Sequence, residues 1–319
     1  MYKQFYGLKR NPFEISPDPN FYCPTPSHNE ALASLAYGIE KRKGFVVVTG
    51  EVGTGKTLMI QCLMRWLSTH RIAFSHVFNT RLSPNEFLRY LLADLGLAIA
   101  GKDKSEYLQQ LNHYLINRFR QGSTTALIVD EGQLLDWEVL EEIRLLTNLE
   151  TFTQKLLQIV LIGQPELDDK LDSSELRQLK QRVAFRCRLK PLSQEETRIY
   201  VQRRLELAGA AANKESIFGE KALAPIFHYS HGIPRLVNTI CENSLIAGFA
   251  SQKERITPEI IEQVARDFRL DENSSIHPTP RKNGERSAMR EELYRLIQLI
   301  DADEKSEMNE AIYGERVKQ

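Results

Sequence analysis

The sequence predicts an α/β protein with a five-stranded parallel sheet flanked by helices, followed by an all-helical C-terminal domain. Three observations support this fold class. Short apolar segments alternate with amphipathic segments of helical period, which is typical of strands buried on both faces between covering helices. A glycine-rich loop separates the first of these strands from the helix after it. Beyond residue 191, only helical periodicity remains.

The composition is that of an ordinary globular chain. It has 319 residues, 42% hydrophobic and 26% charged, with 42 Lys or Arg against 42 Asp or Glu and a formal net charge of +0. These values exclude a disordered or collagen-like chain and argue against a uniformly basic nucleic-acid-binding protein, while a local basic patch stays open. We find no apolar run of membrane-spanning length, no signal peptide and no metal-ligand spacing among the 4 cysteines. We therefore expect a cytoplasmic protein with free thiols, peripheral to the inner membrane only through a partner.

The elements of the α/β part follow in chain order. Residues 1–30 are too rich in Pro and aromatic residues for a long helix or strand, and an amphipathic helix is expected at 31–43. Apolar runs predict strands at 45–49, 72–78, 126–129, 157–162 and 185–189. Helices with one apolar face are expected after residue 56 and at 86–97, 107–120 and 139–149.

The last part of the chain contains only helix signals. Ser193 and Glu196 form a capping box, and Gly209 fits the position after the helix that they open. Further helices are expected at 221–229, 234–249 and 258–268, then a polar linker at 271–288 and a short helix at 290–300. The predicted domains are an N-terminal segment (1–43), an α/β nucleotide-binding domain (44–191), a helical domain (192–270) and a tail (271–319).

A phosphate-binding loop is the strongest functional signal. The pattern G-x-x-x-x-G-K-[ST] is met without a mismatch by Gly50, Glu51, Val52, Gly53, Thr54, Gly55, Lys56 and Thr57. Glycines let backbone N–H groups turn inward around phosphate oxygens at a helix N-terminus, whose dipole favours anions. We expect Lys56 to reach the β- and γ-phosphates of ATP and the Thr57 hydroxyl to bind Mg²⁺. The alternative is a glycine-rich turn without a ligand.

An acidic pair ends the third predicted strand. Asp130 and Glu131 directly follow the apolar run at 127–129. Asp130 is expected to hold Mg²⁺, and Glu131 to polarise a water for attack on the γ-phosphate. Acids at a strand end are a weak signal alone, but their place downstream of the glycine-rich loop makes the signal strong.

Three further positions are candidates for sensing or completing a nucleotide site. Gln164 follows the fourth strand, where an amide can hydrogen-bond the γ-phosphate or the water; an ordinary polar strand end is the alternative. Arg235 opens a helix and can bridge to the γ-phosphate; a surface arginine is the alternative. The basic stretch 177–188 contains our preferred arginine finger, Arg182, with Arg186 second. That stretch also suits a phosphate-binding surface or a solvated face.

These motifs together resemble the ExeA-like (general secretion pathway protein A) family of AAA+ P-loop ATPases. The likeness covers roughly residues 1–270 and runs through YGL…PF, PDP, GEVGTGKT, LIVDEGQLL, LIGQPEL and HGIPRLVN. The resemblance implies Walker A at Gly50–Thr57, Walker B at Asp130–Glu131, sensors at Gln164 and Arg235, and a finger near Arg182. It also implies a homo-oligomer with ATP at the subunit boundary. The N-terminal segment would pack beside the adenine through Tyr6, Pro12 or Phe13.

Three functions stay open at this point. The resemblance favours an ATPase that drives assembly of a cell-envelope export system, for secretion, a pilus or exopolysaccharide, with an envelope-assembly protein as partner. The basic stretch favours an ATP-dependent DNA-binding regulator of transposition. A slow nucleotide-dependent scaffold, recruiting partners through 271–319, is the third. The secretion member of the family continues into a membrane helix and a peptidoglycan-binding domain, whereas this sequence ends in polar residues, so direct wall anchoring is not expected.

Overall fold

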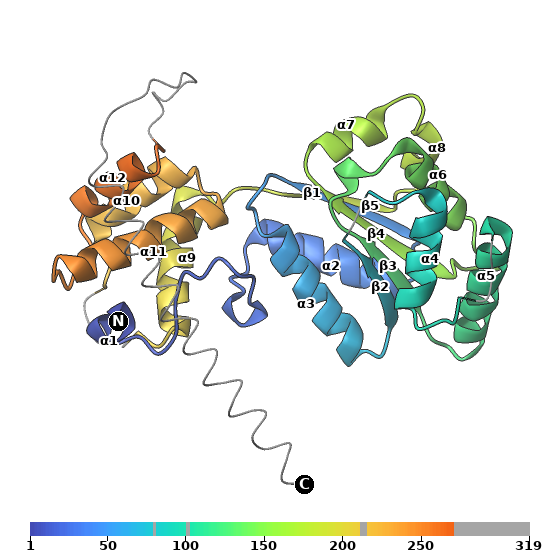
Figure 1. Cartoon of the computed structure of the whole chain (residues 1–319), viewed down its shortest axis with the longest axis horizontal. Helices are drawn as coiled ribbons and strands as arrows, with labels where there is room; N and C mark the ends of the chain where they lie inside the picture. Colours follow the sequence, from blue (N-terminus) through green and yellow to red (C-terminus); the bar gives the residue numbers. More distant parts are fainter. Residues whose placement is uncertain (79–80, 100–102, 211–215, 271–319) are drawn as a thin grey trace, which may run out of the picture. The chain divides into compact units, whose positions relative to one another are not determined.

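A computed structural model describes residues 1–78, 81–99, 103–210 and 216–270 (Figure 1). The predicted linker at 271–288 and helix at 290–300 lie outside the described residues. All described elements belong to one compact unit.

The five-stranded parallel sheet that the sequence predicts is confirmed. Its strands are β1 (Phe45–Gly50), β2 (Ala73–Val77), β3 (Thr125–Val129), β4 (Leu157–Gly163) and β5 (Phe185–Leu189). They pair in parallel in the order β2-β3-β4-β1-β5. Every residue of β1, β3 and β4 is buried, because helices cover both faces of the sheet; these strands therefore appear in the sequence as continuous apolar runs.

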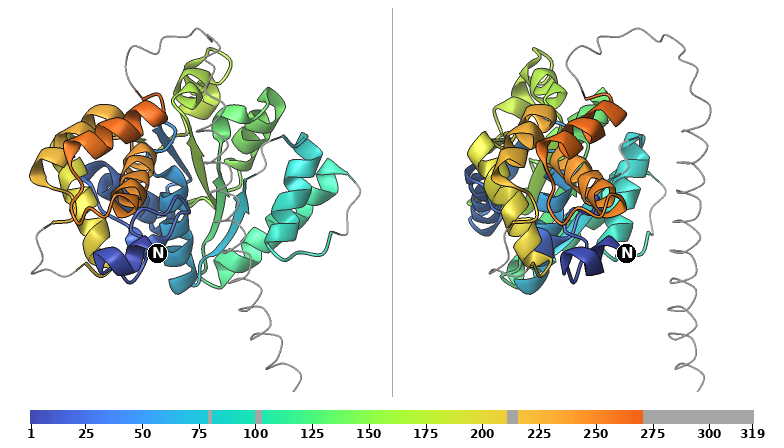
Figure 2. Two further views of the ribbon diagram at one scale, coloured as in Figure 1. Left: turned by 60° about the vertical axis from the view of Figure 1, so that its left-hand side comes forward. Right: turned by 90° about the vertical axis from the view of Figure 1, so that its left-hand side faces the viewer.

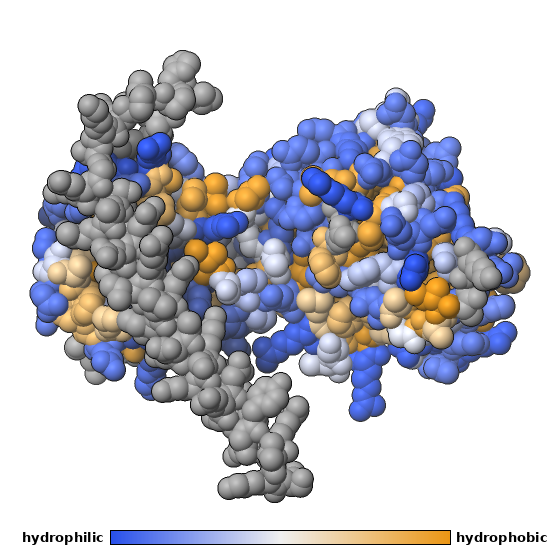
Figure 3. Space-filling view, viewed as in Figure 1, coloured by the Kyte–Doolittle hydropathy of each residue, from blue (hydrophilic) through white to orange (hydrophobic). Residues whose placement is uncertain are grey.

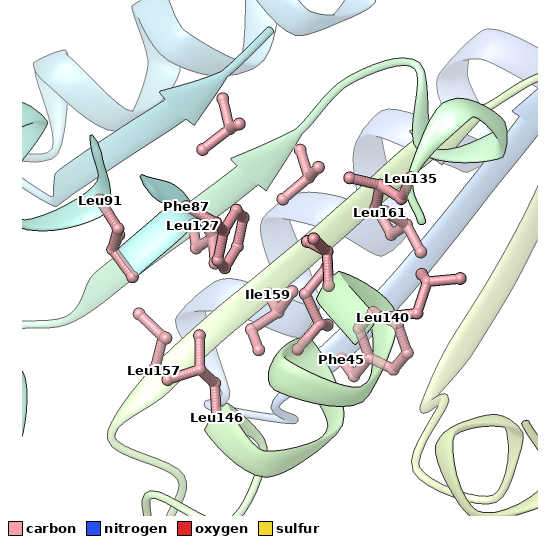
Figure 4. Close-up of a cluster of buried hydrophobic side chains, with 14 of the residues drawn as sticks. Phe45, Phe87, Leu91, Leu127, Leu135, Leu140, Leu146, Leu157, Ile159 and Leu161 are labelled. Atoms are coloured by element: carbon pink, nitrogen blue, oxygen red, sulfur yellow. The ribbon is translucent and has the colours of Figure 1, made fainter. Parts of the chain in front are cut away.

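Two hydrophobic clusters hold the helices to the sheet. Val46 and Val48 of β1 pack on one face with α2 (Pro26–Glu40) and α3 (Lys56–Thr69). The alternate residues Phe45 and Val47 face the other cluster, with α4 (Pro84–Asp94), α5 (Lys104–Arg120) and α6 (Trp137–Leu146) (Figure 4). This alternation follows from the two-residue period of a strand.

The helical part consists of α9 (Gln194–Leu207), α10 (Glu220–Ser230), α11 (Pro234–Ala250) and α12 (Pro258–Asp267). The predicted capping box is present: Glu196 N–H donates to Ser193 Oγ at 3.2 Å, and Ser193 N–H donates to Glu196 Oε2 at 2.7 Å. Gly209 lies past the end of α9 with φ +94°, the left-handed conformation that favours glycine at this position.

The N-terminal segment is more regular than predicted. It contains a short helix, α1 (Tyr2–Tyr6), and a 3₁₀ turn, η1 (Pro19–Phe21). The chain here lies against the helical part (Figure 2). The ring centroids of Phe5 and Phe249 are 5.5 Å apart, and Phe13 is fully buried. Five residues carry too little periodicity to predict α1; tertiary packing stabilises it.

One helix boundary and two short helices correct the sequence prediction. Helix α2 begins at Pro26, before the expected residue 31, because the Thr25 hydroxyl caps it and proline suits the first helical position. Two short helices, α7 (Glu166–Asp172) and α8 (Arg177–Lys180), were not predicted. They lie between β4 and β5 and are also too short to show a clear period.

The visible surface agrees with the ordinary composition. Within the described ranges, no helix has both the length and the hydropathy needed to cross a membrane. Most of the described surface in Figure 3 is hydrophilic, with smaller hydrophobic areas between.

Candidate functional site

The glycine-rich loop joins the carboxyl end of β1 to the start of α3. Gly53 and Gly55 have φ values of +83° and +99°, a region that side chains disfavour. A Cβ on Gly50 would lie 2.8 Å from Thr54 Oγ1 and 2.9 Å from Leu189 Cβ, so the turn has room only for glycine. Helix α3 has 14 residues, and the N–H groups of its first turn have no acceptor within the helix. Their positive dipole end makes the loop a suitable cradle for an anion.

The Lys56 ammonium lies within this loop. Its Nζ donates to the carbonyl oxygens of Gly50 at 2.7 Å and Glu51 at 3.0 Å, and the residue is 7% exposed. Burial lowers the pKa of Lys56, while the charges of Glu131 and Asp130 act in the opposite direction. The carboxylates of Glu131 and Asp130 therefore lie close enough to Lys56 for their charges to act on it.

The acidic pair follows β3. Asp130 is 8% exposed, and its Oδ1 accepts from the Glu131 N–H at 2.8 Å. Burial raises the pKa of Asp130. Glu131 is half-buried with φ +51°. Its Oε2 accepts from Gln133 Nε2 at 2.6 Å and from Gln164 Nε2 at 3.4 Å. The structure thus brings Glu131 and Gln164 together.

A cavity of about 430 Å³ lies over the glycine-rich loop. Its walls include Val52, Gly53, Gly55, Lys56 and Thr57 of the loop, Glu131 and Gln164 from the strand ends, residues 14–18, Tyr200, Arg204, Pro234, Arg235 and Asn238. The predicted site residues that do not line it are Gly50, Glu51, Thr54, Asp130 and Arg182. Glu51, Thr54 and Asp130 are each adjacent in sequence to a lining residue.

The helical part contacts the loop directly. The backbone N–H of Arg235, in the first turn of α11, donates to the Gly53 carbonyl oxygen at 3.2 Å. A Cβ on Gly53 would lie 2.8 Å from Arg235 Cβ and 2.9 Å from Ile233 Cγ2. The start of α11 therefore rests on the loop, with the exposed Arg235 side chain at the cavity.

The two candidate fingers have different surroundings. Arg182 follows α8 and is half-buried, away from the cavity of its own chain. Arg186 forms ion pairs within its own chain, from Nε to Asp168 Oδ1 at 2.8 Å and from Nη1 to Asp172 Oδ1 at 2.9 Å. Asp168 also accepts from the Thr49 hydroxyl at 2.7 Å. Arg186 thus ties α7 to the sheet.

Sequence reasoning missed a buried arginine beside the cavity. Arg204 on α9 is 4% exposed, and its guanidinium donates to the Pro12 carbonyl oxygen, to Tyr200 Oη at 3.0 Å and to the Glu14 carbonyl oxygen at 3.4 Å. Its Cζ lies 4.9 Å from the Phe21 ring centroid. The four-residue spacing of Tyr200 and Arg204 places them on one face of α9, and it was the sequence signal from which their contact could have been predicted.

In the N-terminal segment, residues 14–18 line the cavity, whereas Tyr6 and Phe13 are buried in the helical core and do not.

A histidine under the loop was also missed. His28 Nε2 lies 2.9 Å from the Thr54 carbonyl oxygen, and His28 Nδ1 lies 2.7 Å from Thr25 Oγ1. A carbonyl only accepts, so Nε2 carries a proton and donates, and in the neutral ring Nδ1 accepts from the Thr25 hydroxyl. Burial lowers the pKa of His28. No sequence motif pointed to this contact.

Sequence comparison identifies the domain. Residues 39–171 match the family model described as an AAA domain. The chain is 43% identical over 260 residues to General secretion pathway protein A of Aeromonas hydrophila, an alignment that covers 80% of this chain and 46% of that protein. The chain therefore spans about half the length of this relative. The resemblance expected from the motifs is confirmed, and the AAA domain supports the expected ATPase activity.

Solved structures share the fold. Cdc6p from Pyrobaculum aerophilum is 19% identical with a TM-score of 0.60, covering 79% of this chain and 70% of that one. Drosophila ORC bound to DNA is 19% identical with a TM-score of 0.60, and the match covers 84% of this chain and 65% of that one. The Aeropyrum pernix ORC1 protein in complex with DNA is 15% identical with a TM-score of 0.59, and the match covers 81% of this chain and 69% of that one. At these identities, the likeness shows the fold alone.

Proposed function

We propose that this chain, with its AAA domain at residues 39–171, binds ATP with Mg²⁺ and hydrolyses it. One observation carries the proposal: side chains from the start of α3 and from the carboxyl ends of β3 and β4 line a single cavity of about 430 Å³, namely Lys56, Thr57, Glu131 and Gln164. The proposed units are an α/β nucleotide-binding domain at 44–191 and a helical lid at 192–270.

The donor set matches a triphosphate. The backbone N–H groups of the loop and the Lys56 ammonium would bind phosphate oxygens. Thr57 and Asp130 would hold Mg²⁺, which neutralises phosphate charge when bound. A hydroxyl and a carboxylate are both oxygen ligands, which Mg²⁺ prefers, and Mg²⁺ is usually held by one or two protein groups together with phosphate oxygens and waters.

Glu131 would act as the general base. Its carboxylate accepts a proton from the water that attacks the γ-phosphorus, the bond to the β–γ bridging oxygen breaks, and ADP and inorganic phosphate leave. The Gln164 amide would donate a hydrogen bond to the γ-phosphate or the water. The backbone of Arg235 already contacts the loop at Gly53. Its side chain would bind the γ-phosphate and so couple nucleotide binding to the position of the helical part.

We further propose that the site is completed by a second copy of the chain. Arg182 lies away from the cavity of its own chain and would reach the nucleotide of a neighbour as an arginine finger. In sedimentation, Mg·ATP should shift the chain to a larger species. Arg182→Ala should lower turnover without weakening ATP binding; full turnover by this variant would place the finger elsewhere.

The pathway proposal rests on the relative's name. Similarity to General secretion pathway protein A favours coupling of ATP hydrolysis to assembly of a cell-envelope export system. The alternative, an ATP-dependent DNA-binding regulator of transposition, is favoured by the exposed cations Arg177, Lys180, Arg188 and Lys190. Gel shifts with Mg·ATP across a salt series test it, since phosphate contacts are strongest at low salt. Absence of binding at low salt would exclude the DNA function.

Single-turnover and steady-state hydrolysis test the enzyme. Glu131→Gln should keep ATP affinity and lower turnover by about 10²-fold or more, because general-base catalysis contributes that much. Lys56→Ala should lose ATP binding. Lys41→Ala is the matched control, since Lys41 is an exposed lysine whose ammonium pairs with its neighbour Glu40 at 3.0 Å. Equal turnover by Glu131→Gln and the unsubstituted chain would refute the assignment.

A further inference from the structure

Gln133 joins the two polar groups of the strand ends. It lies in the 3₁₀ turn η2 (Gly132–Leu134), directly after the acidic pair. Its Nε2 donates to Glu131 Oε2 at 2.6 Å, and its Oε1 accepts from the Gln164 backbone N–H at 2.9 Å. With the Gln164 Nε2 contact to the same Glu131 oxygen at 3.4 Å, these bonds close a ring of three residues.

The chemistry of the ring fixes the orientation of the Gln133 amide. A backbone N–H only donates, so the group that faces Gln164 N must be the amide oxygen of Gln133. The amide nitrogen therefore faces Glu131, where a carboxylate only accepts. If the amide were reversed, its NH₂ group would face the Gln164 N–H, which is also a donor. Its oxygen would then face the Glu131 carboxylate, which is also an acceptor.

The turn that carries Gln133 is held tightly against β4. A Cβ on Gly132 would lie 2.7 Å from Leu161 Cδ1, and a Cβ on Gly163 would lie 2.8 Å from Gln133 Oε1. Lys170 of α7 donates from Nζ to the carbonyl oxygens of Gln133 at 2.9 Å and Leu135 at 2.7 Å. The Gln133 side chain thus projects from a backbone that is anchored on two sides.

Glu131 needs such a support. Its φ of +51° lies in the left-handed region, which is uncommon for residues other than glycine and persists where surrounding contacts hold it. Its side chain would otherwise sample several rotamers, and catalysis by a general base depends on a fixed position. Glu131 lines the cavity, whereas Gln133 does not.

We propose that Gln133 is the positioning residue of the site: it binds Glu131 Oε2 and leaves Oε1 to accept the proton of the attacking water. The same Gln133 amide links the Glu131 carboxylate to the backbone of Gln164. It therefore fixes the position of the general base relative to Gln164. This inference rests on the proposed ATPase function.

Two substitutions separate the parts of this role. Gln133→Glu keeps an acceptor for the Gln164 N–H but places a second carboxylate beside Glu131, and like charges raise the apparent pKa of such a pair. The acid limb of the kcat profile should move up by about 1 pH unit or more, with kcat at pH 7 reduced about 10- to 100-fold. Gln133→Met removes both hydrogen bonds, and should lower kcat about 10-fold without moving the profile.

The other charged groups near Glu131 stay constant in this comparison. Asp130 precedes Glu131 in the chain, and the charges of both carboxylates act on the Lys56 ammonium, as do those of Glu51 and Glu166. Lys170 of α7 donates to the Gln133 carbonyl oxygen, and Arg235 of α11 lines the same cavity as Glu131. The matched control is Gln109→Glu, the same charge change at an exposed position of α5. It should leave rate and profile unchanged.

The experiment measures kcat against pH, ATP dissociation constants and melting temperatures of the full-length variants. The inference predicts ATP affinity within about threefold of the unsubstituted chain for both Gln133 variants. Unchanged rates and profiles, faster hydrolysis by Gln133→Met, or equal losses of ATP binding and kcat would each overturn it. If the unsubstituted chain does not hydrolyse ATP, or does so without Glu131, the proposed function itself fails; if hydrolysis needs Glu131 but not Gln133, only this inference fails.

Discussion

Removing the Arg204 guanidinium should destabilise the fold strongly. The perturbation is Arg204→Met, which keeps much of the side-chain length but removes the donors to Pro12 O, Tyr200 Oη and Glu14 O. Hydrogen bonds from charged donors contribute about 1.5–3 kcal/mol each. The contact to Glu14, at 3.4 Å, is long, so we count two full bonds and expect a loss of about 3–6 kcal/mol.

The neighbouring residue provides a control for this measurement. Arg203 lies on the same helix, but its side chain is 54% exposed, and it pairs with Glu206 across 3.1 Å at the surface. Such exposed pairs contribute about 0–1 kcal/mol, so Arg203→Met should change the free energy of unfolding by no more than that. Urea denaturation of the full-length chain measures both. Equal losses for the two variants would refute the idea that Arg204 fastens the N-terminal segment to the helical part.

Three further predictions concern the turn before α11, the histidine beside the glycine-rich loop and the two candidate arginine fingers. Gly232 has φ +71°, and a Cβ there would collide with the Leu192 carbonyl group, so Gly232→Ala should cost about 3 kcal/mol in urea denaturation; a loss below 1 kcal/mol would contradict this. Because burial lowers the pKa of His28 below its ordinary 6.5, the unfolded chain binds more protons between these two values, and stability should fall as pH drops below about 6.5. The melting temperature of His28→Gln should depend less on pH than that of the unsubstituted chain. An equal pH dependence in both would contradict the role assigned to His28. Arg186→Ala should lower stability by about 1 kcal/mol, whereas Arg182→Ala should lower turnover at unchanged stability; the reverse pattern would exchange their roles.

The sheet and the glycine-rich loop were predictable because local sequence determines them. Strands β1, β3 and β4 are buried on both faces, so their apolar runs stand out. The loop needs glycine wherever φ is positive or the backbone is close, as at Gly53 and Gly50, and that requirement leaves a fixed spacing in the sequence.

The supports of the site were not predictable because they depend on contacts distant in the sequence. His28 touches the loop from α2, and Arg204 of α9 binds the carbonyl group of Pro12, 192 positions away. Gln133 lies close in sequence to Glu131, but only the fold places its oxygen on Gln164. Helix α1 has five residues and is stabilised by packing rather than by its own periodicity.

Titration calorimetry with Mg·ATP measures directly whether the glycine-rich loop binds a nucleotide. We expect saturable binding to the full-length chain at one site per chain, and loss of that binding in Lys56→Ala with the melting temperature of the apo chain preserved. A folded chain that takes up no nucleotide in the presence of Mg²⁺, or a Lys56→Ala variant that binds as well as the unsubstituted chain, would contradict it.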